Sequence, residues 1–154
     1  SIAIGAGASD TTTQPVPGGE QIAVLLGPDT SASGNSALTT VLGPSAKTNQ
    51  GYSVSLGAHA ETTGGQGSIA IGGYSGDAGS TIADGQGSIA IGGYGASATS
   101  DGAVAIGYQS QAPNPYEATF GNLGSEKLDL NVTGNLTVHG SDIDINGDVD
   151  IINT

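Results

Sequence analysis

Short runs of alternating apolar and small residues recur along the first 121 residues, and each run ends at a glycine. The phrase Ser-Ile-Ala-Ile-Gly occurs at 1–5, 68–72 and 88–92, and Ala-Val-Ala-Ile-Gly fills 103–107. In a strand, the residues one and three positions before the glycine point to one face, and the residue between them points to the other. Each run therefore predicts a short strand closed by a glycine turn.

The closing glycines set a regular spacing along the chain. They are Gly5, Gly27, Gly43, Gly57, Gly72, Gly92, Gly107 and Gly121, and successive members are 22, 16, 14, 15, 20, 15 and 14 residues apart. Two strands and two turns occupy roughly 14–16 residues, which is one coil of a parallel β-solenoid. The two long intervals predict the same unit with inserted loops, at 10–21 and 75–86, because insertions in solenoids form loops.

A large apolar residue stands directly before every closing glycine. These residues are Ile4, Leu26, Leu42, Leu56, Ile71, Ile91, Ile106 and Phe120. We expect this column, called the apolar ladder below, to face a core. One coil cannot bury its own face, so its stability must come from neighbouring coils.

The pattern changes beyond Gly121. After a junction at 122–127, the segment 128–154 consists of short runs in which apolar and polar residues alternate. These runs recur every six to seven residues and are interrupted by glycines. This pattern predicts short, half-buried strands with glycine or Asn-Gly turns. A strip with a single apolar face cannot form a core alone, so we expect other copies of the chain to complete it. The predicted domains are a repeat domain at 1–121 and a second β-repeat at 128–154.

The composition favours a stack of coils over a close-packed globule. The chain has 28 glycines, only 4% aromatic residues, and neither Trp nor Met. A globular core normally depends on large aromatic and aliphatic side chains. This chain must therefore bury small residues in a narrow, regular arrangement.

The charge restricts the possible partners. The net charge is −12, and Lys47 and Lys127 are the only Lys or Arg residues. Contacts to phosphates need clustered Lys or Arg, so we expect no nucleic-acid partner. No apolar run approaches the length of a transmembrane helix, so we expect no direct membrane insertion. Because the chain begins at Ser1 inside a repeat, we expect a processed chain or part of a longer one.

The repeated phrase (Ser/Ala)-(Ile/Val)-Ala-Ile-Gly, followed by a Ser/Ala-x-Ala run, resembles the head repeats of YadA-like trimeric autotransporter adhesins over about residues 1–121. The resemblance implies a left-handed parallel β-roll, of which three copies pack around a threefold axis. The expected fold class is therefore all-β. It comprises a β-roll, or β-solenoid, assembled as a homotrimer and followed by a short intertwined trimeric β-repeat segment.

A second resemblance concerns the C-terminal segment. The bacterial family usually continues into a neck with a motif like Asp-Ala-Val-Asn-Val and a coiled-coil stalk, and neither is present in this sequence. Residues 130–140 instead resemble the Gly-Asn-Leu-Thr-Val-x-Gly repeats of bacteriophage tail and neck fibres. We therefore expect first a structural or adhesive segment of a phage-type fibre, which mediates or spaces attachment to a host surface.

Three alternatives remain beside the phage fibre. The main one is the head domain of a bacterial trimeric autotransporter adhesin that binds host or matrix ligands. A trimeric depolymerase tailspike and a passive fibre without a ligand are the others. No Ser/His/Asp spacing or Gly-x-Ser-x-Gly elbow is visible, so we expect no enzyme. All the non-enzymatic alternatives place the chain outside the cell, on a virion fibre or a bacterial surface.

The candidate contact residues lie in a tyrosine column and in the two inserted loops. Tyr74 and Tyr94 occupy the same position in adjacent repeats, and Tyr108 lies one position earlier in the next. Exposed tyrosines can stack on sugar rings or dock a protein, but they also commonly cover a subunit seam. The loop candidates are Thr12, Gln14, Glu20, Asp77 and Asp84. The expected ligand is a glycan or protein of the host surface.

One acidic run resembles part of a calcium loop. Its candidate ligands are Asp142, Asp144, Asn146, Asp148 and Asp150. The position that should supply a bidentate Glu carries Asn153, and strand alternation also places these side chains towards solvent. Two interpretations therefore stay open: the acidic side chains form a solvent-facing surface, or they bind a structural cation. We expect no other cofactor.

Overall fold

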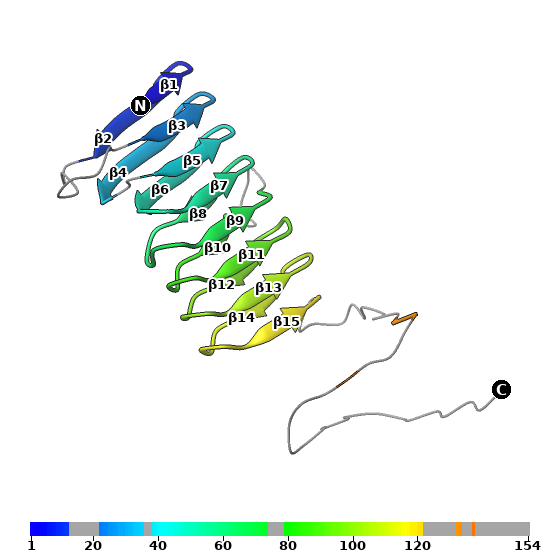
Figure 1. The fold of residues 1–154 in the computed structure, drawn as a ribbon. Helices are drawn as coiled ribbons and strands as arrows, with labels where there is room; N and C mark the ends of the chain where they lie inside the picture. The colour runs from blue at the N-terminus through cyan, green and yellow to red at the C-terminus, as the bar shows by residue number, and fades with distance from the viewer. Residues whose placement is uncertain (13–21, 36–37, 74–78, 122–131, 134–136, 138–154) are drawn as a thin grey trace.

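The computed structural model describes residues 1–12, 22–35, 38–73, 79–121, 132–133 and 137. Within these residues all regular structure is β-strand, in two parallel sheets that stack coil upon coil (Figure 1). No helix that could cross a membrane occurs in this part of the chain. The prediction of an all-β parallel β-roll is confirmed.

The strands alternate between the two sheets. The eight-stranded sheet contains β1 (Ile2–Ile4), β3 (Ala23–Leu26), β5 (Thr39–Leu42), β7 (Val54–Leu56), β9 (Ile69–Ile71), β11 (Ile89–Ile91), β13 (Val104–Ile106) and β15 (Ala118–Phe120). The seven-stranded sheet contains β2 (Ser9–Thr12), β4 (Ser31–Asn35), β6 (Lys47–Gln50), β8 (Ala60–Thr62), β10 (Thr81–Ala83), β12 (Ser97–Ala98) and β14 (Gln111–Ala112). Each strand therefore pairs with the equivalent strand of the next coil.

The register follows the glycine spacing. Ile4 pairs with Leu26, and Ile106 pairs with Phe120, so the apolar ladder runs in line through all eight coils. From the second coil onward, each closing glycine donates its backbone N–H to the ladder residue of the preceding coil, as in Gly27 N to Ile4 O at 2.9 Å. The predicted repeat of eight coils is confirmed.

The closing glycines bring neighbouring coils into close backbone contact. Gly72 has φ of 119°, and a Cβ built there would lie 1.8 Å from the carbonyl oxygen of Gly92. A side chain would therefore collide with the backbone of the next coil, in a region that L-residues avoid. This is why the position carries glycine in every coil.

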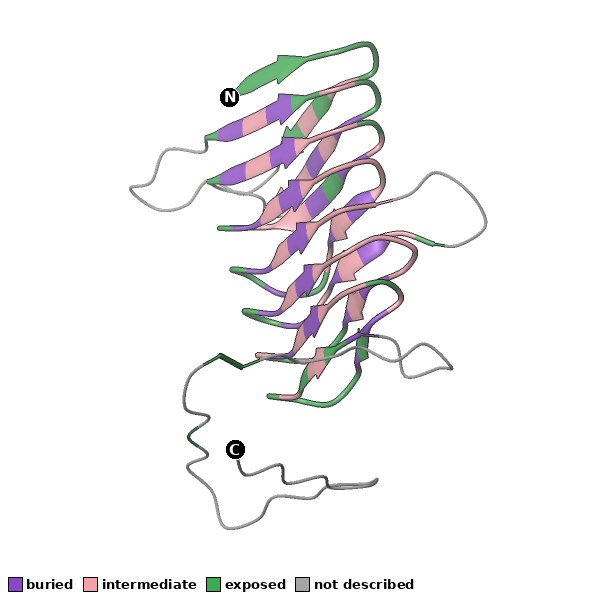
Figure 2. Ribbon diagram, turned by 90° about the vertical axis from the view of Figure 1, so that its right-hand side faces the viewer, coloured by how far each residue is buried: buried purple, intermediate pink, exposed green. Residues whose placement is uncertain are grey.

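The prediction that the apolar ladder faces the core is wrong for a single chain. Ile4 is 61% exposed, Phe120 52% and Leu26 38%, and the other ladder residues are half-buried. The interior is filled from the opposite face of the same strands, where Leu25, Val41, Ser55, Ala70, Ala90 and Ala105 are fully buried. Figure 2 shows this alternation of buried and partly exposed positions along the strands.

The interior is narrow because each coil is short. Ala32, Ala60, Ala83, Ala98 and Ala112 of the seven-stranded sheet complete the core, together with buried Thr48, Thr62 and Thr81. Apart from Leu25 and Val41, the buried side chains are those of Ala, Ser and Thr, and the larger side chains of the apolar ladder lie on the outside. The prediction that the chain buries small residues in a narrow arrangement is confirmed.

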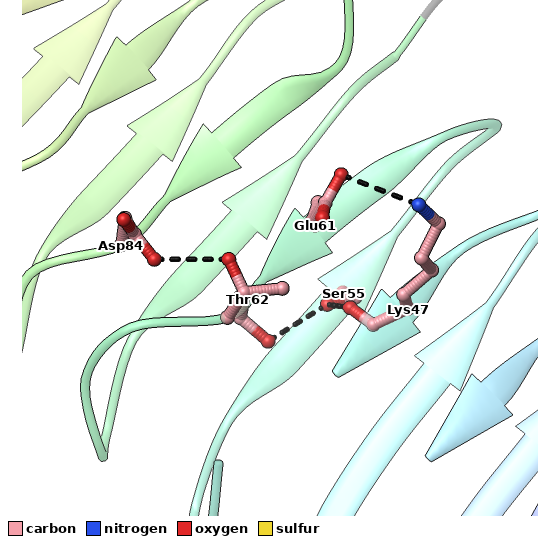
Figure 3. A network of polar contacts seen from close by, with 6 residues as sticks. Lys47, Ser55, Glu61, Thr62 and Asp84 are labelled. Carbon is pink, nitrogen blue, oxygen red and sulfur yellow. Dashed lines mark hydrogen bonds and ion pairs between the residues drawn. The ribbon is translucent and has the colours of Figure 1, made fainter. Parts of the chain in front are cut away.

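The buried hydroxyl groups of Ser55 and Thr62 are hydrogen-bonded inside the roll. The Ser55 hydroxyl donates to the carbonyl oxygen of Lys47 at 2.8 Å, and its oxygen lies 3.0 Å from the Thr62 hydroxyl (Figure 3). Because the Ser55 proton is already used, the Thr62 hydroxyl is the donor in this second bond. The pair links the two sheets within one coil.

We expect Ser55→Ala to lower the free energy of unfolding by about 1–2 kcal/mol, because it leaves the buried Thr62 proton without its acceptor. The double variant Ser55→Ala, Thr62→Val should recover part of this loss, because it removes both polar partners. Denaturant unfolding at one fixed protein concentration measures both effects. Strictly additive losses would show that the two hydroxyls are not coupled.

Candidate functional site

The two outer faces of the roll differ in chemistry. The eight-stranded sheet presents the apolar ladder and, two residues earlier in each strand, a second column that includes Ile69, Ile89 and Val104. No charged residue occurs in either column. A continuous apolar face of this kind marks an interaction surface. Chemically, the face is suited to packing against another protein surface.

The outer face of the seven-stranded sheet is mainly polar. Its outward residues in successive coils are Ser9, Ser31, Lys47, Glu61, Ile82, Ser97 and Gln111. Lys47 and Glu61 form an ion pair across neighbouring strands, with 3.7 Å between Nζ and Oε2 (Figure 3). An exposed pair of this kind contributes little stability, but it fits a surface that faces water.

The structure brings together part of the predicted tyrosine column. The rings of Tyr94 and Tyr108 lie with centroids 5.1 Å apart and planes tilted by 36°. Tyr94 has a left-handed backbone with φ of 58°, and Tyr108 is exposed. Tyr74 lies outside the described residues. The pair is compatible with either predicted role, and its function as a ligand surface stays a prediction.

Few of the predicted loop residues can be placed. Thr12 ends β2, whereas Gln14, Glu20 and Asp77 lie outside the described residues. Asp84 follows β10, and its Oδ1 accepts a hydrogen bond from the Thr63 hydroxyl at 2.9 Å (Figure 3). Asp84 also lines the hollow described below.

The five candidate cation ligands, Asp142, Asp144, Asn146, Asp148 and Asp150, lie outside the described residues. The described ranges contain no group of three or more His, Cys, Asp or Glu side chains placed to hold a metal ion. The predicted phage-type segment at 128–154 lies almost entirely outside the described residues as well. Both interpretations stay predictions.

A polar hollow of about 310 Å³ lies along the turns that lead from the seven-stranded sheet back to the eight-stranded sheet. It is lined by Gln50, Gly64, Gly65, Gln66, Asp84, Gln86 and Asp101. The Gln86 backbone N–H donates to Asp101 Oδ1 at 2.9 Å, which fixes that carboxylate. Of these residues, sequence reasoning selected only Asp84. The available signal was the phrase Gly-Gln-Gly at 65–67 and 85–87, which indicated turns alone.

Two exposed tyrosines on the same turns were also missed. Tyr52 and Tyr116 are 55% and 84% exposed, and both have left-handed backbones. They occur singly in the sequence, but each stands five residues before a closing glycine, Gly57 or Gly121, and this spacing was the signal that could have found them. The turn edge therefore combines amides, carboxylates and aromatic rings in one place.

The comparisons with known proteins support the first resemblance. The model of the YadA head domain repeat (2 copies) matches residues 37–60, 79–94 and 83–110. No curated protein and no solved structure matches the chain. The matched family is an adhesin-type structural repeat and not an enzyme family. The match favours the adhesin head over the phage fibre, for which these comparisons give no support.

Proposed function

We propose that this chain is a head segment of a homotrimeric adhesin exposed on a bacterial surface, where it mediates attachment to host or matrix ligands. The observation that carries the proposal is the uncharged apolar face of the eight-stranded sheet. The YadA head repeat match supports the adhesin class and an extracellular location. The coils themselves act as scaffold, and contact with a ligand falls to turns and loops.

The occupant of the apolar face is a second copy of the chain. Every copy carries the same straight ladder in the same register, so like faces can pack coil against coil around a closed rotation axis. The acidic residues in the described part of the chain, such as Asp29, Glu61 and Asp101, lie outside this face, and they stay in solvent when it is covered. The polar, ion-paired outer face of the other sheet has the composition of a surface that stays wet.

Threefold closure is the arrangement that the resemblance to the adhesin heads implies. We expect sedimentation equilibrium to give a species of three times the 14.8 kDa chain mass. The association should persist in high salt, because the face contains no charged groups to be screened. A monomer that keeps its full β-sheet content by circular dichroism would contradict the proposal.

Attachment is tested separately from assembly. The purified trimer should bind to host cells or to extracellular matrix, and soluble trimer should compete with that binding. Absence of binding to both would reduce the chain to a passive spacer. The phage-fibre interpretation rests on the resemblance of residues 130–140 and stays a prediction.

A further inference from the structure

We propose that the turn edge of the roll is a binding groove for a neutral, linear oligosaccharide. The groove runs along the turns that precede five consecutive strands of the eight-stranded sheet. Backbone hydrogen bonds join each turn to the next, as in Gly87 N to Gln66 O and Gly102 N to Gln86 O, both 2.9 Å. The turns therefore form one continuous surface parallel to the stack.

A column of left-handed residues runs along this surface. At the equivalent position of six successive coils, φ lies between 56° and 72°, at Leu38, Tyr52, Gly67, Gly87, Gly102 and Tyr116. Three glycines thus stand between two exposed tyrosines. A Cβ built at Gly67 or Gly87 would meet nothing within 4 Å, so this stretch is open to solvent. Because glycine has no side chain, these three positions form a gap with a tyrosine ring at each end.

Tyr116 closes one end by direct contact. A Cβ built at Gly102 would lie 2.8 Å from Cδ1 of Tyr116, so the ring rests against the glycine of the preceding coil. At about 4.8 Å per coil, the four steps from Tyr52 to Tyr116 span roughly 19 Å. The gap is therefore long and narrow, and it suits an extended chain better than a compact molecule.

The polar hollow lies beside this glycine gap. Gln66, Gln86 and Asp101 occupy the same position in three successive coils, directly before the left-handed glycine. Gln66 and Gln86 are both exposed, and each side-chain amide offers N–H donors and a carbonyl acceptor. Asp101 and Asp84 add acceptors that are held by Gln86 N and the Thr63 hydroxyl. Polar groups consequently repeat along the groove at the spacing of the coils.

A neutral sugar chain fits this combination of groups. Its hydroxyls both donate and accept, so they can pair with amides and carboxylates, and the apolar face of a sugar ring can stack on tyrosine. The two carboxylates and the net charge of −12 disfavour anionic glycans. The lining residues are almost all polar or glycine, which excludes a lipid or an apolar peptide. All the residues that line the hollow belong to one chain.

This inference deepens the attachment function proposed above and rests on it only for the biological source of the sugar. An array should carry neutral linear oligosaccharides of four or more units beside sialylated and sulfated ones. We expect the chain to retain neutral members and to reject the anionic ones. Retention of anionic glycans alone, or of none, would overturn the inference.

The best neutral binder on the array is then titrated into the variants by calorimetry. We expect Gln66→Ala with Gln86→Ala to weaken binding at least about tenfold, because hydrogen bonds to the sugar are lost. Gln111→Ala removes an exposed glutamine from the outer face of β14 and should change the affinity by less than about twofold. Equal effects of the two changes would place the sugar elsewhere.

Sedimentation of the same samples separates the two proposals. A trimer that binds no neutral glycan would overturn the groove and leave the assembly intact. A monomer that binds the glycan through Gln66 and Gln86 would overturn the trimer and retain the groove. Tyr116→Ala should also weaken binding, without any change in sedimentation, because its ring lies on the turn edge.

Discussion

Gly72→Ala should lower the free energy of unfolding by about 3 kcal/mol or more, and the variant is expected to fail to accumulate as a folded protein. The new Cβ would lie 1.8 Å from the carbonyl oxygen of Gly92, and the φ of 119° is unfavourable for an L-residue. Relief of the collision requires separation of two coils, which lengthens the hydrogen bond from Gly92 N to Ile71 O, now 2.8 Å. The effect is therefore transmitted along the stack.

Gly67→Ala is the matched control for this prediction. Gly67 also has a positive φ, at 72°, but a Cβ there would meet nothing within 4 Å. Its cost should be about 1–2 kcal/mol, the usual penalty for a left-handed L-residue. Denaturant unfolding followed by circular dichroism, at one chain concentration, compares the two variants. Equal losses would mean that backbone contact between coils is not what selects glycine.

Ile71→Lys should convert the trimer into monomers. Ile71 lies in the middle of the apolar ladder, paired with Leu56 on one side and Ile91 on the other. In the proposed assembly the ammonium group would be buried among apolar side chains without a partner, at a cost of several kcal/mol per chain. Sedimentation velocity measures the loss of the trimer, and thermal unfolding should show a lower midpoint.

Ile82→Lys makes the same substitution on the opposite face. Ile82 lies on the polar outer face of β10 and is paired with Glu61, so a lysine there gains an acidic neighbour. This variant should sediment as the trimer with nearly unchanged stability. If both variants stay trimeric, the subunits associate through a surface other than the ladder. If both dissociate, the loss of the trimer comes from the added charge or from misfolding, and not from a substitution within the apolar face.

The sequence predicted the coil register correctly because the backbone leaves no alternative to glycine at one place in each coil. Counting between closing glycines was enough to align Ile4 with Leu26 and Ile106 with Phe120 across coils. The prediction of inserted loops at 10–21 and 75–86 is partly wrong, because residues 10–12 belong to β2 (Ser9–Thr12) and β10 is Thr81–Ala83. The two long intervals nevertheless leave the alignment of the apolar ladder undisturbed. Because this steric requirement applies to a single residue in each coil, it can be recognised from the sequence alone.

The direction of the two faces could not be read in the same way. Alternation separates Ile4 from Ala3 but does not say which of them points inside, and the larger apolar residue was assigned to the core. In a coil of about 15 residues the two sheets are too close for large side chains on both inner faces. The small residues between the ladder positions, such as Ala70 and Ala90, were the informative signal. Size, and not hydrophobicity alone, decides the interior of this fold.

The turn groove depends on stacking, which a linear sequence does not display. Gln66 and Gln86 are separated by an inserted loop, and Asp101 differs from both in residue type. All three nevertheless stand six residues before a closing glycine, and Tyr52 and Tyr116 each stand five before one, so the glycine spacing already places them in columns. What the sequence does not display is that the turns of successive coils join into one hollow. Turn composition alone had indicated only that the chain reverses there.

Since each coil pairs only with its immediate neighbours, the length of the roll is not fixed by the fold. Residues 65–74 and 85–94 are identical, as expected if a segment of the gene had been copied in tandem. Such a copying event would add one coil. The apolar ladder, the polar outer face and the turn groove would then each become one coil longer. In the proposed adhesin, the reach from the cell surface and the number of binding positions could then evolve by recombination, without any new fold having to be found.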